Sequence, residues 1–311
     1  MTEQVKIRIH PVERCPLCGE KGSDIVLTEH HEFAYAHVAW SYLNEEPLHL
    51  RRCHSCGFGY TGALPPKVFF EEVLYSPMPG APPPLGADAP GGKEYIFRHI
   101  LKLFARHGAR GRLVDLGCSG GRFLWHARAN FERAEGIEND SGAAELATRH
   151  GIQIRVGAIL ALLPSLKGEV DAITLIDVLE HLPDPLAHLA GARDALKAGG
   201  FLYVKVPHQW GQLRKERLIA ALGMRPTRMA VNFVHINHFS EASLTNALRN
   251  LGFEIVCAQV SPPELYRLSA KPAHLISNFL RLSQYFCARA IRALTGQNFG
   301  LNVEVLARRP R

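Results

Sequence analysis

The stretch that decides the fold is Arg112-Leu113-Val114-Asp115-Leu116-Gly117-Cys118-Ser119-Gly120-Gly121-Arg122-Phe123-Leu124-Trp125. Its apolar residues leading to an aspartate predict a short buried strand, its glycines a tight turn, and Arg122 to His126 the start of a helix. Glycine suits a backbone that takes positive φ or approaches a ligand closely, and a helix N-terminus directs unpaired N–H groups at that space. The stretch indicates a nucleotide-binding loop, with an ordinary strand-to-helix turn as the alternative.

An acidic residue at the end of the next strand-like segment favours the nucleotide interpretation. Glu138 ends the segment Ala134 to Glu138 and follows Gly117 by 21 positions. At this spacing the second strand of a doubly wound sheet places a carboxylate on ribose hydroxyls. Two carboxylate oxygens match a vicinal diol, and the alternative is a surface acid. A later strand-like segment, starting at Val170, runs into an acidic loop that contains a histidine.

Together these segments resemble the class I S-adenosylmethionine-dependent methyltransferases. The family's first loop, hydrophobic-Asp-x-Gly-x-Gly-x-Gly, is matched by Asp115, Gly117 and Gly121. Its fourth-strand signature, Asp-x-Leu-Glu-His-x-x-Asp-Pro, is matched from Asp177 to Pro185. The resemblance implies an α/β fold with a doubly wound, mostly parallel seven-stranded sheet of the Rossmann-like methyltransferase type. It also implies a methyltransferase that uses S-adenosylmethionine.

The resemblance assigns cofactor-binding roles to individual residues. Loop backbone would contact the cofactor, Asp115 would anchor the loop and the methionine amino group, and Glu138 would bind the ribose hydroxyls. Asn139 and Ala158 would flank the adenine, and Asp177 with Val178 would line the methionine moiety. The full predicted set is Asp115, Gly117, Cys118, Gly121, Glu138, Asn139, Ala158, Asp177 and Val178.

Two positions depart from the family's pattern. Ser119 stands where the middle glycine of the loop is usual, which narrows the backbone conformations available there. Ala158 stands where many relatives carry an acidic or polar side chain that holds the adenine amino group. Adenine contacts would therefore have to come from the backbone or from elsewhere in the chain.

Histidines near the fourth-strand loop are candidates for a general base. Methyl transfer from a sulfonium is an in-line displacement, so alignment of the reactants supplies much of the catalysis. A base is needed when the acceptor carries a proton of high pKa. His181 is the leading candidate, and its alternative role is structural, bonded to a backbone carbonyl. His208, His235 and His238 are the other candidates, and the sequence does not choose among the four.

Two Cys-x-x-Cys-Gly knuckles near the N-terminus predict a metal site. They comprise Cys15 with Cys18 and Cys53 with Cys56. Four thiolates form the closed tetrahedral shell of structural zinc, which leaves no position for water. The strand-like segments between the knuckles indicate a zinc ribbon, and redox-active dithiols or unmetallated cysteines are the alternatives. A knuckle pair ahead of a methyltransferase core resembles a subgroup that modifies sugars and other natural-product intermediates.

The chain divides into parts by composition. We predict a zinc-binding ribbon domain over residues 1–74, a Pro/Gly-rich linker over 75–92 and a methyltransferase domain over 93–311. Within the last, residues 209–239 are expected to form a lid and residues 262–296 a helical insertion. The basic amphipathic helix expected over 272–295 could contact a membrane surface, and a place in the core or in a dimer contact is the alternative.

Bulk composition limits the class of protein. The formal net charge of +7, with 47% hydrophobic and 21% charged residues, is that of an ordinary globular protein and permits an anionic partner without requiring one. The first residues lack the apolar core of a signal peptide, and no run approaches the roughly 18 apolar residues of a membrane span. These features predict a cytoplasmic protein without a transmembrane segment.

The predicted reaction is methyl transfer from S-adenosylmethionine to a small molecule, such as a sugar nucleotide or another natural-product or glycan intermediate. Oxygen is favoured over carbon and nitrogen as the methylated atom. One alternative is an RNA methyltransferase whose zinc ribbon grips the substrate, but the ribbon lacks the dense lysine and arginine that phosphate binding requires. A non-catalytic cofactor-binding partner protein is the other alternative. The sequence does not define the acceptor or the oligomeric state.

Overall fold

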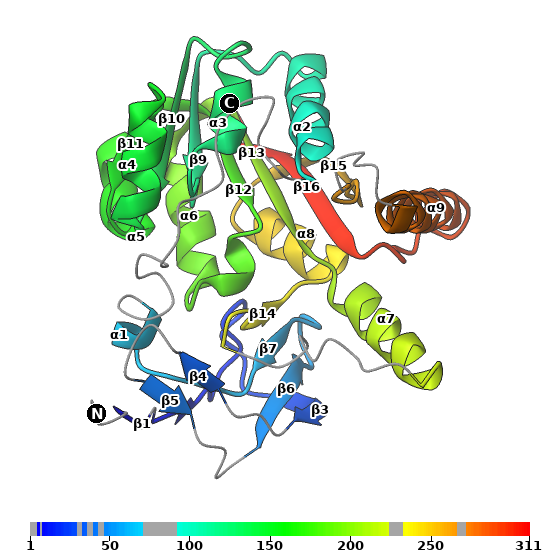
Figure 1. Ribbon diagram of the computed structural model, residues 1–311. Helices are drawn as coiled ribbons and strands as arrows, with labels where there is room; N and C mark the ends of the chain where they lie inside the picture. Colours follow the sequence, from blue (N-terminus) through cyan, green and yellow to red (C-terminus); the bar gives the residue numbers. More distant parts are fainter. Residues whose placement is uncertain are drawn as a thin grey trace.

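The computed structural model shows a large α/β part and a smaller N-terminal unit of short strands beneath it (Figure 1). The name N-terminal unit is used for the described residues between 5 and 70. The predicted linker over 75–92 lies outside the described residues except for Gly92. The structure describes residues 5–6, 8–29, 33–35, 40–42, 47–70, 92–223, 233–265 and 272–311.

A seven-stranded sheet forms the centre of the α/β part. Its strand order is β11-β10-β9-β12-β13-β16-β15, and only the pairs made by β16 are antiparallel. This confirms the predicted doubly wound, mostly parallel sheet. The strands are β9 (Arg112–Leu116), β10 (Arg133–Glu138), β11 (Gln153–Val156), β12 (Val170–Ile176), β13 (Leu196–Pro207), β15 (Glu254–Val260) and β16 (Asn302–Arg308).

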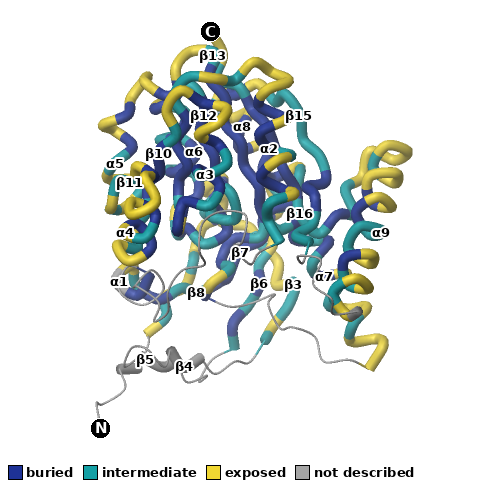
Figure 2. Tube along the Cα trace, turned by 45° about the horizontal axis from the view of Figure 1, so that its top comes forward, coloured by how far each residue is buried: buried dark blue, intermediate teal, exposed yellow. Residues whose placement is uncertain are grey.

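Helices cover both faces of this sheet because its strands are apolar on both sides. Leu113 packs in the cluster beneath one set of helices, and the next residue, Val114, packs in the cluster beneath the other set. In Figure 2 the central strands β9, β12, β13 and β16 are mostly dark blue, and much of the outer side of the helices is yellow. The first set is α2 (Glu94–Arg106), α3 (Arg122–Ala127) and α4 (Ser141–Arg149). The second is α5 (Ile159–Leu162), η2 (Leu163–Leu166), α6 (Pro185–Ala195) and α8 (Glu241–Asn250).

Local sequence sets where several of these helices begin. The Asp140 carboxylate accepts hydrogen bonds from the backbone N–H groups of Gly142 and Ala143 at the start of α4. Ser240 and Ser243 form a capping box at the start of α8. Such caps satisfy N–H groups that have no partner within the helix. These caps fix the starts of α4 and α8, whereas α3, after the glycine loop, begins at Gly121 without a side-chain cap.

The N-terminal unit is completed by a strand from the second half of the chain. Its four-stranded sheet has the order β14-β7-β6-β3, in which Asn237 of β14 pairs with Tyr60 and His238 with Gly59. Phe239 then packs on Phe58 with ring centroids 4.8 Å apart. The predicted ribbon domain therefore shares a sheet with residues from the predicted methyltransferase domain. The strands are β3 (Ser23–Glu29), β6 (Leu48–Cys53), β7 (Gly59–Thr61) and β14 (Asn237–His238).

Smaller elements complete the N-terminal unit. A three-stranded sheet has the order β1-β5-β4, and β2 pairs with β8. After β8 the chain turns into the short helix α1, which lies beside the carboxyl edge of the large sheet (Figure 1). The bounds are β1 (Val5–Lys6), β2 (His10–Pro11), β4 (Phe33–Tyr35), β5 (Trp40–Tyr42), β8 (Ala63–Leu64) and α1 (Lys67–Phe69).

Two helices project from the body of the molecule, α7 (Gln209–Ala221) and α9 (Pro272–Thr295). Tyr285 and Ala288 of α9 are buried. Much of its apolar surface is exposed, so this stripe is not part of the core of the chain. Its contact with a membrane or with a second copy stays a prediction. Within the described residues, no helix combines the length and hydropathy needed to cross a bilayer. The exposed large apolar residues of α9 are Leu275, Ile276, Phe279, Leu280, Phe286, Ile291 and Leu294.

Candidate functional site

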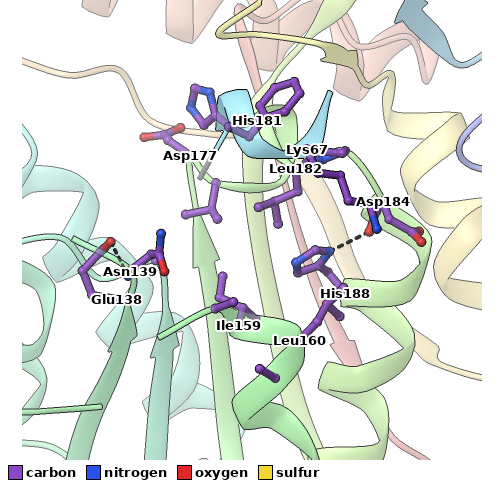
Figure 3. A pocket seen from close by; sticks show the side chains of 16 residues that line it. Lys67, Glu138, Asn139, Ile159, Leu160, Asp177, His181, Leu182, Asp184 and His188 are labelled. Atoms are coloured by element: carbon purple, nitrogen blue, oxygen red, sulfur yellow. Dashed lines mark hydrogen bonds between the residues drawn. The ribbon is translucent and has the colours of Figure 1, made fainter. Parts of the chain in front are cut away.

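A cavity of about 480 Å³ opens at the carboxyl ends of β9, β10 and β12. Ligands in open α/β sheets bind at this edge, and the volume falls in the range of about 300–1,000 Å³ typical of small-molecule sites. Figure 3 shows Glu138 and Asn139 on one side of it, with Asp177 and His181 on another. The lining residues are Lys67, Phe70, Gly117, Glu138, Asn139, Ala158, Ile159, Leu160, Ala161, Asp177, Val178, His181, Leu182, Pro183, Asp184 and His188.

Most of the predicted cofactor residues meet at this cavity, although their roles stay predictions. Asp115, Cys118 and Gly121 are not among its lining residues, and of the four candidate bases His181 alone is. The described part of segment 209–239 also contributes no lining residue, so its role as a lid stays a prediction. The predicted residues that line the cavity are Gly117, Glu138, Asn139, Ala158, Asp177, Val178 and His181.

The Glu138 carboxylate holds the glycine loop in place. Its Oε2 accepts a hydrogen bond from the Ser119 N–H at 2.7 Å, and its Oε1 accepts from Asn139 N–H at 2.7 Å and Asp140 N–H at 2.9 Å. A carboxylate has about four acceptor positions, so one position, on Oε2, remains for a ligand hydroxyl. Ser119 has a φ of 46°, a left-handed conformation that costs a serine roughly 1–2 kcal/mol. The charge-assisted bond from its N–H offsets part of this cost.

Gly117 cannot carry a side chain without displacing Val178. Its φ is 73°, and an added Cβ would lie 2.7 Å from Val178 Cγ2. Val178 is β-branched and therefore stiff, and its movement would narrow the cavity that it lines. The loop thus brings backbone close to the ligand space at a position that only glycine fits.

We expect Gly117→Ala to destabilise the protein by about 1–3 kcal/mol more than Gly108→Ala does, because of this overpacking. Gly108 is a matched control, since its φ is also 73° and nothing lies within 4 Å of an added Cβ. Both variants carry the same backbone strain, so urea unfolding of the pair isolates the collision. Equal losses of stability in the two variants would show that Val178 moves aside freely.

Asp115 lies beneath the loop and not in the cavity wall. It accepts a hydrogen bond from Thr174 Oγ1 at 2.6 Å, which ties β9 to β12. Burial raises its pKa to about 7, although the bond from Thr174 acts in the opposite direction. Cys118 is also buried, with its sulfur against Gly136, where an added Cβ would lie 2.3 Å away. Neither side chain lines the cavity, and the bond to Thr174 agrees with the loop-anchoring part of the role predicted for Asp115. Contact of either residue with the cofactor stays a prediction.

Asp177 is the centre of an ion-pair network at the cavity. Its Oδ1 lies 2.5 Å from Lys205 Nζ, and its Oδ2 lies 2.8 Å from Lys93 Nζ. Burial opposes ionisation of this carboxyl, but the two ammonium groups outweigh it and hold its pKa well below the usual range. Sequence reasoning missed both lysines. Lys205 interrupts an apolar strand, and a buried lysine requires an acidic partner, so this signal was available.

The four candidate histidines are not equally placed. His181 Nδ1 lies 2.6 Å from the Val234 carbonyl, so Nδ1 donates and Nε2 is left as an acceptor. The His235 ring lies 4.8 Å from that of His181, centroid to centroid. His238 is half-buried, and its Nε2 is buried with no hydrogen-bond partner within the described residues. His208 is held by the Gly300 carbonyl, away from the cavity lining.

Burial lowers the pKa of each of these histidines, so the neutral form dominates near pH 7. The pKa falls to about 4 for His235 and to about 3 for His238, and a neighbouring histidine adds to the effect of burial in each case. Burial raises the pKa of Glu180 to about 8, and the charge of Asp177 adds to it. These two stretches of chain therefore place neutral imidazoles near the Glu180 carboxyl group, which ionises at a higher pH than an ordinary carboxyl.

Several lining residues could not be found from motifs. Lys67 and Phe70 come from the N-terminal unit, far from the glycine loop in sequence. Ile159 and Leu160 follow the predicted adenine position and give this wall an apolar character. An apolar run directly after a cofactor position could have suggested them. No sequence motif indicated that Lys67 and Phe70 would line the cavity.

The four knuckle cysteines meet at one point. Their sulfurs lie within 4.8 Å of one another, with Cys15 and Cys56 at 3.6 Å and Cys18 and Cys53 at 3.5 Å. Four sulfurs about 2.3 Å from a tetrahedral zinc are roughly 3.8 Å apart, so the spacing fits that ion. The distances exceed the roughly 2.05 Å of a disulfide bond. The residues present therefore fit a closed tetrahedral metal shell.

Comparison with known proteins identifies the family. A family profile described as "Methyltransferase domain" matches residues 91–258, just over half of the chain. The chain therefore belongs to this methyltransferase family, as the resemblance in its motifs implied. The fold and the family agree on the class I S-adenosylmethionine-dependent type.

Relatives among characterised proteins match over part of their length. The chain is 31% identical over 132 residues to the ubiquinone biosynthesis O-methyltransferase of Xanthomonas campestris pv. campestris (strain B100), which is 40% of this chain and 52% of that protein. It is 30% identical over 131 residues to the protein of the same name from Xylella fastidiosa (strain M23), covering 40% and 51%. The chain thus spans about half the length of these relatives.

One solved structure supports the fold. A chain of the complex that contains the Haloferax volcanii Trm112 methyltransferase activator superposes with a TM-score of 0.50. The match covers 70% of this chain and 92% of that chain at 16% identity. At this identity the likeness shows a shared fold alone.

Proposed function

We propose that this protein transfers a methyl group from S-adenosylmethionine to a small-molecule acceptor, with oxygen favoured as the methylated atom. The observation that carries the proposal is the meeting of Gly117, Glu138 and Asp177 at one cavity, at the carboxyl ends of three parallel strands. The relatives named above are O-methyltransferases of ubiquinone biosynthesis, which supports oxygen. Sugar nucleotides and other natural-product or glycan intermediates stay within the proposed acceptor class.

The cavity residues fit the cofactor. Glu138 would accept from the ribose hydroxyls, because its oxygens retain acceptor capacity beside the three backbone donors. Ala158, Ile159 and Leu160 would pack on the adenine, and Asp177 would face the methionine end. The bound cofactor supplies an electrophilic methyl sulfonium. The protein's part is to hold it in line with the acceptor and to exclude water.

The acceptor would lie between the large sheet and the N-terminal unit. Lys67 and Phe70 line the cavity from one side, and His181 lines it from the η3 helix (Leu179–His181). An exposed ammonium and an aromatic ring suit an acceptor that carries an anionic group or a ring. The neutral His181 imidazole is placed to act on the acceptor's proton.

The four cysteines would bind structural zinc. Cys15, Cys18, Cys53 and Cys56 fit a closed shell, and such a shell cross-links the strands of the N-terminal unit without taking part in the reaction. The zinc would contribute to function indirectly, by fixing the position of α1 and so of Lys67 and Phe70 at the cavity.

We expect Glu138→Gln to weaken the binding of S-adenosylhomocysteine by about 10- to 100-fold, because hydrogen bonds to a charged group contribute about 1.5–3 kcal/mol. Isothermal titration calorimetry measures the affinity directly. Glu145→Gln is the matched control, since Glu145 is an exposed acid that pairs with Arg149 on α4. Mass spectrometry of reactions with a panel of hydroxyl-bearing acceptors tests turnover. If the wild-type protein fails to bind the nucleoside, the proposed function is wrong.

A further inference from the structure

Three side chains capable of binding a metal gather beside the cavity, apart from the four cysteines. Glu180, His181 and His235 each present one ligand atom, and these atoms lie within 4.8 Å of one another. They come from two segments that are more than 50 residues apart. One carboxylate and two imidazoles are a ligand set found in catalytic zinc and iron sites.

Hydrogen bonds clamp these two segments together. Asn237 Nδ2 donates to the Leu179 carbonyl at 3.0 Å and to the Leu182 carbonyl at 2.6 Å, and the Ile236 N–H donates to the Glu180 carbonyl at 3.0 Å. Asn237 itself is 4% exposed. The cluster is therefore held by buried backbone contacts, and its geometry does not depend on mobile surface side chains.

Glu180 is the least explained polar group of this region. Its side chain is 2% exposed, its Oε1 lies 3.8 Å from His181 Nε2, and its Oε2 has no hydrogen-bond partner within the described residues. A buried carboxylate oxygen without a partner costs at least 1–3 kcal/mol, so it calls for a ligand. His181 adds to the case, because Nδ1 donates to a backbone carbonyl and this arrangement orients Nε2 of a metal-binding histidine.

We propose that Glu180, His181 and His235 bind a divalent transition-metal ion of the zinc type at the wall of the acceptor cavity. The surrounding charges select the class of ion. Lys93 and Lys205 neutralise Asp177, so the site lacks the surplus of carboxylates that Mg²⁺ or Ca²⁺ requires. Imidazole nitrogen suits Zn²⁺, Co²⁺ and Fe²⁺.

The proposed ion would have an open position for the acceptor, and this step rests on the proposed function. Three protein ligands leave a fourth site, and His181 already lines the cavity. A hydroxyl held there would ionise more readily, as zinc-bound water does with a pKa near 7 compared with about 15.7 in bulk. Its proton would pass to solvent. With Nε2 of His181 bound to the metal, the ion would take over from this imidazole in promoting loss of the acceptor's proton. The resulting oxyanion would form a C–O bond with the methyl carbon as the C–S bond breaks, with the electron pair kept by sulfur.

The test is metal binding by the whole 311-residue chain with zinc held in the cysteine site, and Co²⁺ is the probe. We expect one Co²⁺ per chain, with visible bands of nitrogen and oxygen ligation and without the sulfur charge-transfer bands of the cysteine site. Glu180→Gln and His235→Asn are each expected to weaken Co²⁺ binding by at least about tenfold. His150→Asn changes an exposed histidine at the end of α4, outside the cluster, and this control should bind as wild type does.

Other readouts separate a failed site from a failed fold. Urea unfolding and S-adenosylhomocysteine affinity are measured for each variant, and His235→Asn decides the question if Glu180→Gln does not fold. Variants that bind Co²⁺ as tightly as wild type, or a wild type that binds none outside the cysteine site, would overturn the inference and leave methyl transfer standing. Absence of nucleoside binding would instead contradict the proposed function. The number of Co²⁺ ions bound per chain would still test the metal site in that case.

Discussion

Replacing Cys53 with serine is expected to remove the proposed structural zinc and to unfold the N-terminal unit. Structural zinc contributes about 10–16 kcal/mol to small domains at pH 7. Apolar packing in a unit of this size rarely supplies more than about 3–5 kcal/mol. Metal binding is therefore expected to contribute more stability than apolar packing. Cys53 is 1% exposed at the end of β6, so water cannot replace the lost ligand unless the sheet opens.

Zinc content by mass spectrometry and limited proteolysis of residues 8–70 measure this loss. Cys287→Ser is the matched control, because Cys287 is an exposed cysteine of α9 far from the knuckles. Lys67 and Phe70 belong to the unit that would unfold. Turnover should therefore fall much more than S-adenosylhomocysteine affinity, which depends on the large sheet. A Cys53→Ser protein that keeps its zinc and resists protease would contradict the assignment.

Replacing Asp177 with asparagine is expected to destabilise the protein by about 3–5 kcal/mol, because it leaves a buried cation without its counter-charge. The Lys205 side chain is 2% exposed and lies 2.5 Å from Asp177 Oδ1. Asparagine keeps the shape of the residue and tolerates the left-handed φ of 56° at this position. The loss measured by urea unfolding is therefore electrostatic and not a result of backbone strain.

A second substitution tests this cause. Lys205→Met in the Asp177→Asn background removes the unpaired cation and should restore part of the stability, since apolar replacement of a buried ion pair is often neutral. Two losses that simply add would show that the pair is not coupled.

The pH dependence of stability should also report the ionisation of Asp177. The pKa of Asp177 in the folded protein is held below its ordinary value, so its contribution is fully present above the unfolded pKa of about 3.9. It is lost as the pH falls through the folded pKa. The stability difference between wild type and Asp177→Asn should thus shrink below about pH 4. Near neutral pH the difference also changes with the ionisation of Glu180, because the charge of Asp177 raises the pKa of that carboxyl. A constant difference at every pH would exclude ionisation of Asp177 as its cause.

The sheet could be predicted because its signals are local. Leu113 and Val114 are adjacent in sequence and pack on opposite faces of the sheet. A run of apolar residues therefore predicts a strand that is buried on both sides. Gly117 lies at the end of that strand, and Glu138 ends the next one. Both positions follow from spacing along one strand-loop-helix unit. Family membership was confirmed because these same spacings define the family's motifs.

The rest of the site could not be predicted because its contacts join distant segments. Lys93 reaches Asp177 across 84 positions, and β14 adds to a sheet whose other strands lie more than 170 residues earlier. His181 and His235 were both candidates for a base, yet nothing in the sequence indicated that they share a cluster with Glu180.

The sequence by itself determined the doubly wound sheet, the glycine loop with Glu138 at the end of the following strand, and the two cysteine knuckles. Each depends on residue spacing within a single turn, strand or hairpin, which short-range backbone geometry controls. Only the tertiary structure decided that the N-terminal unit supplies one wall of the cavity, that Asp177 is neutralised by two lysines, and that Glu180 meets two histidines. Those contacts depend on how separate segments pack, and packing depends on the shape and burial of the whole chain.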